Sequence, residues 1–384
     1  MLSPNNYLRL SNHCFLKQLE EFYVYNIRTD EMYETNQEAF EFLKLCDGSR
    51  QVKELHFENK FANWCLKEGI LNAEPKRRQR RFTIEAAPAP SLRYLEFQIT
   101  SRCNLKCLHC YLGEPAAVDL PKEKIMQVLE EFQTMQGLRL LISGGEPLLH
   151  PYFWTINAVL QNFGFRSILL TNGTLINQDI AKKLKVHEIQ VSLDGIGSSH
   201  DLIRGKDSYT KSISAINLLR ELGKDVSVAT MVHAKNLEDF PRLASLIKSL
   251  GIKEWNVDVP CISGRLAEHK EFQVDHRKAA QFLKYSFGGG LYASSGDLAC
   301  GAHLCTILPD GRVAKCGFFS AEPVGYIDEG LQTCWKRIKH IKLKDLDCNC
   351  DYVQECRGGC RYRALLANNL YSCDPVQCYF RGVN

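Results

Sequence analysis

The chain has 384 residues, of which 45% are hydrophobic and 24% are charged, and its formal net charge is +4. This composition is typical of a globular protein with two or three domains, and so mild a charge does not indicate nucleic acid or a membrane surface as a partner. No apolar run is long enough to span a bilayer, and the polar start, Met1 to Asn6, lacks the regions of a secretion signal. We therefore expect a cytoplasmic protein.

The cysteine content is unusual, because the chain contains 17 cysteines. Disulfides do not persist in a reducing cytosol, so clustered thiols there indicate metal or redox chemistry. A single cysteine also serves as a small buried hydrophobic residue, and that interpretation stays open for the isolated ones.

Residues 1–82 are predicted to form a small α+β unit with the outline of a winged helix. Phe22–Ile27 and Met32–Thr35 have the composition of a hairpin. Three short helices are expected after it, the first ended by a turn that caps the second: Gln37–Cys46, a segment from Arg50 onward, and Phe61–Gly69. Residues 83–90, rich in alanine and proline, and the basic stretch 76–81 before them are predicted to be a solvated linker; a nucleic-acid patch is the alternative.

Residues 91–290 alternate between buried-strand and helical patterns, and the repetition ends there. Six βα repeats predict a parallel sheet with right-handed crossovers, and six are too few for a closed eight-stranded barrel. The fold class expected is therefore α/β, with a partial (β/α)6 barrel. The expected strands are Tyr94–Thr100, Leu138–Ser143, Ser167–Thr171, Glu188–Leu193, Val226–Val232 and Glu254–Pro260.

A loop of three cysteines, Cys103, Cys107 and Cys110, directly follows the first expected strand. Thiolates in this number select iron–sulfur, zinc or copper(I), and a structural zinc would need a fourth ligand from elsewhere. A cubane of four irons held by three cysteines instead leaves one iron open. The loop lies at the carboxyl end of a strand, where parallel α/β folds build their sites.

This loop resembles the diagnostic motif of the radical S-adenosylmethionine (radical SAM) superfamily, and Ser143–Pro147 at the end of the second strand agrees with it. The resemblance implies that Gly144, Gly145 and Glu146 contact the methionine amino group. Polar residues at the later strand ends would complete the cofactor site, with Ser192 and Asp194 near the ribose. The stretch His200–Gly205 resembles one found in peptide-modifying members. The cofactor-binding residues implied are Gly144, Gly145, Glu146, Asn172, Ser192, Asp194 and Arg204.

The resemblance also implies a mechanism. The open iron of a 4Fe–4S cluster would chelate S-adenosylmethionine, and one low-potential electron would split its sulfur–carbon bond. The 5′-deoxyadenosyl radical would then abstract a hydrogen atom from an unactivated carbon, with the protein positioning the reactants and excluding water. The sequence identifies no catalytic side chain or general base.

Residues 291–384 are rich in cysteine and resemble the SPASM extension, which holds two auxiliary 4Fe–4S clusters; two zinc ribbons are the alternative. The spacing Cys348-x-Cys350 is one residue shorter than the SPASM pattern, and Cys373 is the fallback for Cys378. The first implied ligand set is Cys300, Cys305, Cys316 and Cys360, and the second is Cys348, Cys350, Cys356 and Cys378. Most remaining cysteines are expected to be packing residues, although Cys261, after the sixth strand, is also a candidate substrate contact.

The N-terminal unit resembles the peptide-recognition element of ribosomal-peptide maturases, in which a leader peptide adds a strand beside the hairpin; a scaffold role is the alternative. The resemblance implies a maturase that crosslinks a ribosomally made precursor through a thioether or carbon–carbon bond, with a precursor peptide and a low-potential electron donor as partners. Alternatives are oxidation of a Cys or Ser side chain, small-molecule cofactor synthesis, and a non-catalytic iron–sulfur or zinc adaptor.

Overall fold

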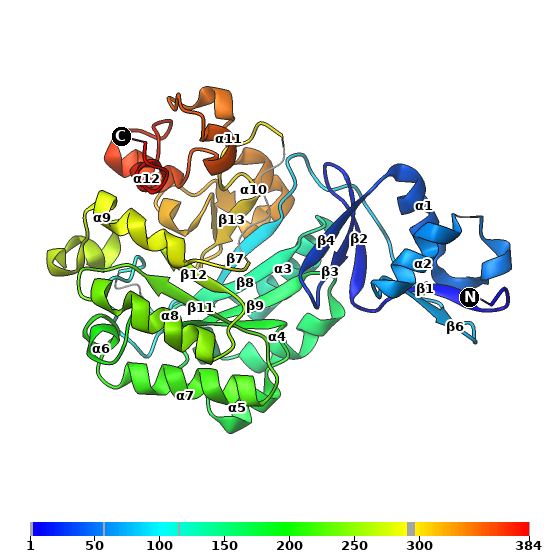
Figure 1. Ribbon diagram of the computed structural model, residues 1–384, viewed down its shortest axis with the longest axis horizontal. Helices are drawn as coiled ribbons and strands as arrows, with labels where there is room; N and C mark the ends of the chain where they lie inside the picture. The colour runs from blue at the N-terminus through cyan, green and yellow to red at the C-terminus, as the bar shows by residue number, and fades with distance from the viewer. Residues whose placement is uncertain (1–2, 57, 114–115, 290–295, 384) are drawn as a thin grey trace.

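The computed structural model describes residues 3–56, 58–113, 116–289 and 296–383, so the predicted boundary at 290/291 lies outside the described residues. Figure 1 shows an N-terminal β-rich unit, a central parallel sheet covered by helices, and a C-terminal region packed on the same sheet. The predicted α/β fold with a small N-terminal unit and a cysteine-rich tail is confirmed.

The core is a sheet in the order β12-β11-β10-β9-β8-β7-β13-β14-β15, in which β7 to β12 are parallel. These six strands match the predicted ones to within two residues at either end, because strands buried on both faces read as near-continuous apolar runs. Their bounds are β7 Tyr94–Thr100, β8 Arg139–Gly144, β9 Arg166–Thr171, β10 Glu188–Ser192, β11 Val226–Met231 and β12 Trp255–Asp258.

Helices cover the outer face of these strands (Figure 1). Helix α3, for example, buries Ile125, Val128, Leu129 and Phe132 against the sheet, at the spacing that an amphipathic helix requires. The helices from α3 to α9 are α3 Lys122–Thr134, α4 Phe153–Val159, α5 Gln178–Lys183, α6 Ser198–Arg204, α7 Ser208–Glu221, α8 Phe240–Ser249 and α9 His276–Ala280.

The tail continues the barrel sheet, which the sequence did not predict. Strand β13 (Leu304–Ile307) lies parallel to β7, and β14 (Arg312–Ala314) and β15 (Gly325–Tyr326) follow antiparallel. Four helices complete the tail: α10 Leu331–Arg337, α11 Val353–Cys356, α12 Arg361–Ala367 and α13 Pro375–Phe380. No helix in the described part of the chain is long and apolar enough to cross a membrane.

The N-terminal unit holds two three-stranded antiparallel sheets, in the orders β5-β1-β6 and β2-β3-β4. The predicted hairpin is present as β3 and β4, and the first and third predicted helices as α1 and α2. The helix predicted from Arg50 is wrong, because Asp47–Gln51 is a strand followed by one 3-10 turn. The elements are β1 Tyr7–Leu10, β2 Cys14–Gln18, β3 Phe22–Asn26, β4 Glu31–Thr35, α1 Gln37–Leu45, β5 Asp47–Gln51, α2 Asn59–Lys67 and β6 Leu71–Glu74.

The basic stretch 76–81 is not the fully solvated linker that was predicted. The amide of Arg80 donates to the carbonyl of Asp47 at 2.7 Å. Its guanidinium donates to the carbonyl of Cys14 at 2.9 Å and lies 4.5 Å from the ring centre of Phe15. This arginine therefore fastens the segment to the N-terminal unit by charge-assisted hydrogen bonds and a cation–π contact.

The N-terminal unit docks on the amino ends of the barrel strands. Arg166, the first residue of β9, donates to the carbonyls of Ile27 and Arg28 at 2.9 and 3.0 Å and forms a salt bridge of 2.9 Å with Glu188. Arg139, the first residue of β8, forms a salt bridge with Asp30 in the β3–β4 turn. The carboxyl ends of the strands, where the cysteine loop lies, are thus at the opposite end from the N-terminal unit.

Candidate active site

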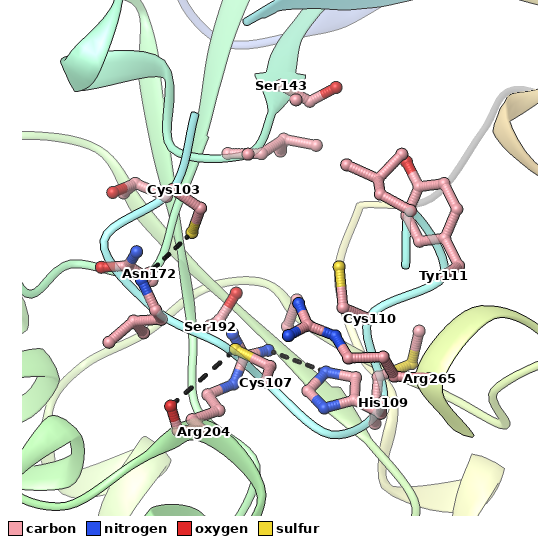
Figure 2. A pocket seen from close by; sticks show the side chains of 18 of the residues that line it. Cys103, Cys107, His109, Cys110, Tyr111, Ser143, Asn172, Ser192, Arg204 and Arg265 are labelled. Atoms are coloured by element: carbon pink, nitrogen blue, oxygen red, sulfur yellow. Dashed lines mark hydrogen bonds between the residues drawn. The ribbon is translucent and has the colours of Figure 1, made fainter. Parts of the chain in front are cut away.

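A cavity of about 1080 Å³ opens at the carboxyl ends of the barrel strands. It joins the cysteine loop, the ends of β7 to β12 and the start of the tail, so segments far apart in the sequence share one wall. Figure 2 shows Cys103, Cys107, His109 and Cys110 on one loop, with Arg204 beside it. Among the predicted site residues, those that line the cavity are Cys103, Cys107, Cys110, Gly144, Gly145, Asn172, Ser192, Asp194 and Arg204.

The cysteine loop has no helix or strand of its own and is held in place by contacts to neighbouring backbone. The amide of Leu108 donates to the carbonyl of Ile203 at 2.8 Å, and the thiol of Cys107 lies 4.0 Å from the carbonyl of Arg204. Burial raises the pKa of Cys107 to about 11, so metal binding there must displace a proton from the thiol. Three thiols on one wall of a wide cavity are the donor set that a cluster with an open iron requires.

The two glycines at the end of β8 are required by the protein backbone itself. A Cβ on Gly144, whose φ is +127°, would lie 2.1 Å from the carbonyl oxygen of Thr100, and a Cβ on Gly145 would lie 2.2 Å from that of Arg102. The amide of Gly145 donates to Thr100 at 2.8 Å. The glycines therefore let β8 lie directly against the segment that enters the cysteine loop.

Glu146 is not among the residues that line the cavity, and its predicted contact with the methionine amino group stays a prediction. Its side chain is fully buried and accepts hydrogen bonds from the hydroxyl of Thr171 and the amide of Asn172, each at 2.9 Å. Burial outweighs these hydrogen bonds and raises the pKa of Glu146 to about 7. Glu146 thus positions the end of β9, while the backbone of Gly144 and Gly145 faces the cavity.

Asn172 connects the end of β9 to the cysteine loop. Its side-chain amide donates to Asn104 Oδ1 at 3.0 Å, and Asn104 in turn donates to the hydroxyl of Thr174 at 2.7 Å. Ser192, at the end of β10, lines the same wall. The predicted cofactor-binding roles of Asn172 and Ser192, the latter near the ribose, stay predictions.

Asp194 and Arg204 form a buried ion pair beside the loop. Burial opposes the charge on Asp194, but the Arg204 guanidinium outweighs it and holds the pKa of that carboxyl below its usual range. His109, in the cysteine loop, lies 3.6 Å from Asp194 through its Nε2, and burial lowers its pKa to about 3. His109 was not among the predicted site residues, although its position between Cys107 and Cys110 was a signal.

A second carboxylate in the cavity, Glu96 on β7, was also missed. It accepts hydrogen bonds from the hydroxyls of Tyr111 at 2.8 Å and Thr306 at 2.7 Å, and from the amide of Gln98 at 3.0 Å. Burial, followed by the charge of Glu96, raises the pKa of Tyr111 well above its usual value. No salt bridge involves Glu96 within the described ranges, so a charged group sits among neutral donors. The signal that could have identified Glu96 was a carboxylate within an otherwise largely apolar strand.

The structure brings together three of the four cysteines predicted for the first auxiliary cluster. Cys300 and Cys316 are both close enough to Cys360 for the charges of their thiolates to interact. Cys305 does not join them: it is fully buried in the core beside Cys334 of α10. Strand β13 points this side chain toward the helix-covered face of the sheet, away from the other three thiols, and its predicted ligand role stays a prediction.

The second predicted set is also brought together in part. Cys350 and Cys356 lie within electrostatic range of Cys378, the predicted final ligand. Cys348, however, forms a disulfide with Cys373, the fallback residue, so its sulfur is not a free thiolate in this structure. The ligand role predicted for Cys348 stays a prediction.

No group of three or more His, Cys, Asp or Glu side chains in the described ranges is arranged as it would be around a single metal ion. The isolated cysteines Cys14, Cys46 and Cys65 are buried in the core of the N-terminal unit.

Comparison with known proteins agrees with this geometry. Residues 97–247 match the model of the Radical SAM superfamily. The AdoMet-dependent heme synthase of Methanosarcina barkeri is 25% identical over 338 residues, 75% of this chain and 97% of that protein. The mycofactocin maturase MftC of Mycolicibacterium smegmatis is 27% identical over 305 residues, 69% of this chain and 77% of that protein.

A solved structure shows the same fold over nearly the whole chain. SuiB of Streptococcus suis, bound to precursor peptide SuiA, aligns over 96% of this chain and 98% of its own, with a TM-score of 0.70 and 14% identity. Residues 97–247 thus form a radical SAM domain, and the chain is a radical SAM enzyme. The adaptor interpretation is therefore wrong. Such a domain implies a 4Fe–4S cluster and S-adenosylmethionine, which three thiols facing a wide cavity fit.

Proposed function

We propose that this enzyme is a maturase of a ribosomally made precursor peptide, in which it forms a thioether or carbon–carbon crosslink. The observation that carries the proposal is a strand edge on the N-terminal unit, fixed to the same barrel that holds the cysteine loop. The similarity to the mycofactocin maturase supports a peptide substrate.

The strand edge is that of β4. In the sheet order β2-β3-β4, the outer side of β4 pairs with no other strand in the described ranges. The opposite edge, β2, is partly covered, because the amide of Ala87 donates to the carbonyl of Gln18 at 2.8 Å. Tyr33 of β4 contacts Trp64 of α2 edge to face at 5.6 Å, and Trp64 is 39% exposed. A leader peptide would gain main-chain hydrogen bonds from β4 and side-chain contacts from this aromatic pair.

The chemistry divides between the implied cofactors and the chain. When bound, the cluster and S-adenosylmethionine supply a radical that abstracts a hydrogen atom from the peptide. The chain's own contribution is to hold the cysteine loop through Asn172 and Arg204, to place the substrate side chain in the cavity and to keep water away. Crosslinking then releases one electron and one proton from the substrate.

We further propose that the tail thiols hold two auxiliary clusters that accept this electron. Cys300, Cys316 and Cys360 would hold the first. The second would be held by Cys350, Cys356 and Cys378, with a fourth thiolate released when the Cys348–Cys373 disulfide is reduced.

A second candidate is the conversion of a heme-related small molecule, which the similarity to the heme synthase favours. One experiment separates the two. Anaerobically reconstituted enzyme is given dithionite, S-adenosylmethionine and a precursor peptide encoded beside its gene, and 5′-deoxyadenosine and peptide mass are measured. The maturase predicts nucleoside formation together with the loss of two hydrogens from the peptide. Nucleoside formation that responds to a porphyrin and leaves the peptide unchanged would establish the second candidate instead.

A further inference from the structure

We propose that Cys261, and not Cys305, is the fourth thiolate ligand of the cluster held by Cys300, Cys316 and Cys360. The inference rests on the proposed function, in which the tail binds auxiliary clusters. It assigns a ligand from the barrel itself, outside the cysteine-rich tail.

Cys305 is excluded by the register of its strand. It pairs with Leu95 of β7, and Thr306 pairs with Glu96. Side chains alternate between the two faces of a strand. The hydroxyl of Thr306 donates to Glu96 inside the cavity at 2.7 Å, so Cys305 faces the other way, into the core beside Leu95. Reaching the thiols around Cys360 would require this strand to slip by one residue, which would turn every side chain over.

Cys261 lies where Cys305 was expected. It follows β12 by three residues, is 5% exposed, and its thiol is hydrogen bonded to that of Cys360. Arg363 of α12, three residues after Cys360, holds the segments that carry the two cysteines together. This arginine donates to the carbonyl of Val259 at 2.8 Å and to Asp258 at 2.9 Å. The end of β12 is thereby held against the segment that carries Cys360.

The other two thiols reach Cys360 through separate contacts. The amide of Cys300 donates to the carbonyl of Arg357 at 2.8 Å, three residues before Cys360. Cys316 is followed by Phe318 and Phe319, whose rings both lie 5.2 Å from that of Tyr362. Four chain segments therefore converge around one thiol.

A buried cation beside these thiols indicates an anionic occupant. Arg361 is 4% exposed and donates to the backbone carbonyls of Gly358, Gly359, Leu370 and Ser372. It makes no salt bridge within the part of the chain that the structure describes. The buried carboxylate of Asp374 is close enough to stabilise the charge of this guanidinium, and a cluster with four thiolate ligands would add a further negative charge. Lys315, on the other side of Cys316, adds a second cation near Cys300 and Cys360.

Cys261 lines the barrel cavity, together with Cys110 and Phe318, whereas Cys300, Cys316 and Cys360 are not among its lining residues. A cluster ligated by Cys261 would therefore adjoin the wall of the substrate cavity. This placement would give the electron leaving the substrate a short path into the tail.

The test compares Cys261 and Cys305, because each is a cluster ligand under one assignment and not under the other. In the full chain with Cys103, Cys107 and Cys110 all changed to alanine, only auxiliary clusters can bind iron. Cys261→Ala and Cys305→Ala are each added, the proteins are reconstituted anaerobically with iron and sulfide, and both elements are measured per chain. Cys261→Ala is expected to lose about half of the iron, the share of one four-iron cluster of two, and Cys305→Ala is expected to keep it.

Iron lost from Cys305→Ala but retained by Cys261→Ala would overturn the inference and leave the auxiliary clusters of the proposed function standing. A parent protein that binds zinc, or no iron at all, would overturn both. Cys261→Ser provides a second readout if the alanine variant fails to fold. An oxygen ligand at this position is expected to shift the electron paramagnetic resonance spectrum of one reduced cluster, and an unchanged spectrum would contradict the assignment.

Discussion

The ammonium of Lys17 on β2 donates a hydrogen bond of 2.8 Å to the backbone carbonyl of Gly137, just before β8, and only 1% of the lysine is exposed. Burial lowers its pKa from 10.5 to about 7. Because the unfolded chain keeps the higher pKa, it binds more protons at this lysine than the folded chain between about pH 7 and 10.5, so the contribution of Lys17 to stability rises with pH across that window.

Replacing this lysine by methionine should therefore flatten the dependence of stability on pH. In wild type, the free energy of unfolding should gain up to about 1.4 kcal/mol per pH unit from this group. Urea denaturation of the apo protein from pH 7 to 10 measures the effect. Lys44→Met, an exposed lysine of α1 in the same unit, is the control and should keep the wild-type slope. Equal slopes for Lys17→Met and wild type would show that the buried amine does not titrate as inferred.

Gly145→Ala should abolish binding of S-adenosylmethionine. The added Cβ would lie 2.2 Å from the carbonyl oxygen of Arg102, so the segment entering the cysteine loop must shift. Equilibrium dialysis of the reconstituted protein measures binding, with a loss of at least tenfold expected. Gly113→Ala, close to the same loop, is the control for backbone strain alone, because its φ is +69° but no atom lies within 4 Å of its added Cβ. If both variants bind alike, close packing at Gly145 is not what shapes the site.

Cys107→Ala should abolish cleavage of S-adenosylmethionine while leaving tail iron in place. This thiol is one of three on the loop, and the tail thiols lie on separate segments, so the two losses should be independent. Formation of 5′-deoxyadenosine and iron content are measured on the same sample. Cys334→Ala, a buried cysteine of the core, should retain both. Cleavage that survives in Cys107→Ala would refute the assignment of the loop.

Trp64→Ala should weaken binding of the precursor peptide about tenfold or more, without changing cleavage of S-adenosylmethionine in the absence of peptide. The indole forms part of the surface beside the β4 edge, and burying an aromatic ring contributes strongly to binding. Fluorescence anisotropy of a labelled peptide measures it. Trp154→Ala on α4 is a matched control, because both tryptophans are 39% exposed. Unchanged affinity in Trp64→Ala would favour the scaffold role.

The parts that the sequence predicted well are those in which local pattern and structure coincide. Strands β7 to β12 are apolar runs, and the cysteine loop is a spacing within eight residues. Strands β5 and β6 were missed because Asp47–Gln51 and Leu71–Glu74 are largely polar, and only their pairing with β1 makes them strands. Strand propensity depends on such neighbours rather than on the residues alone.

Within the site, the surroundings of two predicted residues depend in the same way on distant segments. Spacing alone placed Cys305 with the tail thiols, but the face it occupies depends on the pairing of β13 with β7, more than 200 residues earlier in the chain. Glu146 was expected to bind a ligand amine, but the end of β9 supplies its hydrogen-bond donors. Neither the register of distant strands nor the donors around a buried carboxylate can be read from adjacent residues.

The docking of the N-terminal unit at the amino ends of the barrel strands limits which peptides could be substrates. A segment held along β4 and a residue undergoing chemistry near Cys107 would sit at opposite ends of β7, which has seven residues. At about 3.3 Å per residue, that strand alone is about 23 Å long. The anchored and the altered portions of a substrate must then be separated by at least about seven extended residues. The length of the barrel would thus select substrates by the number of residues between their anchored and altered portions.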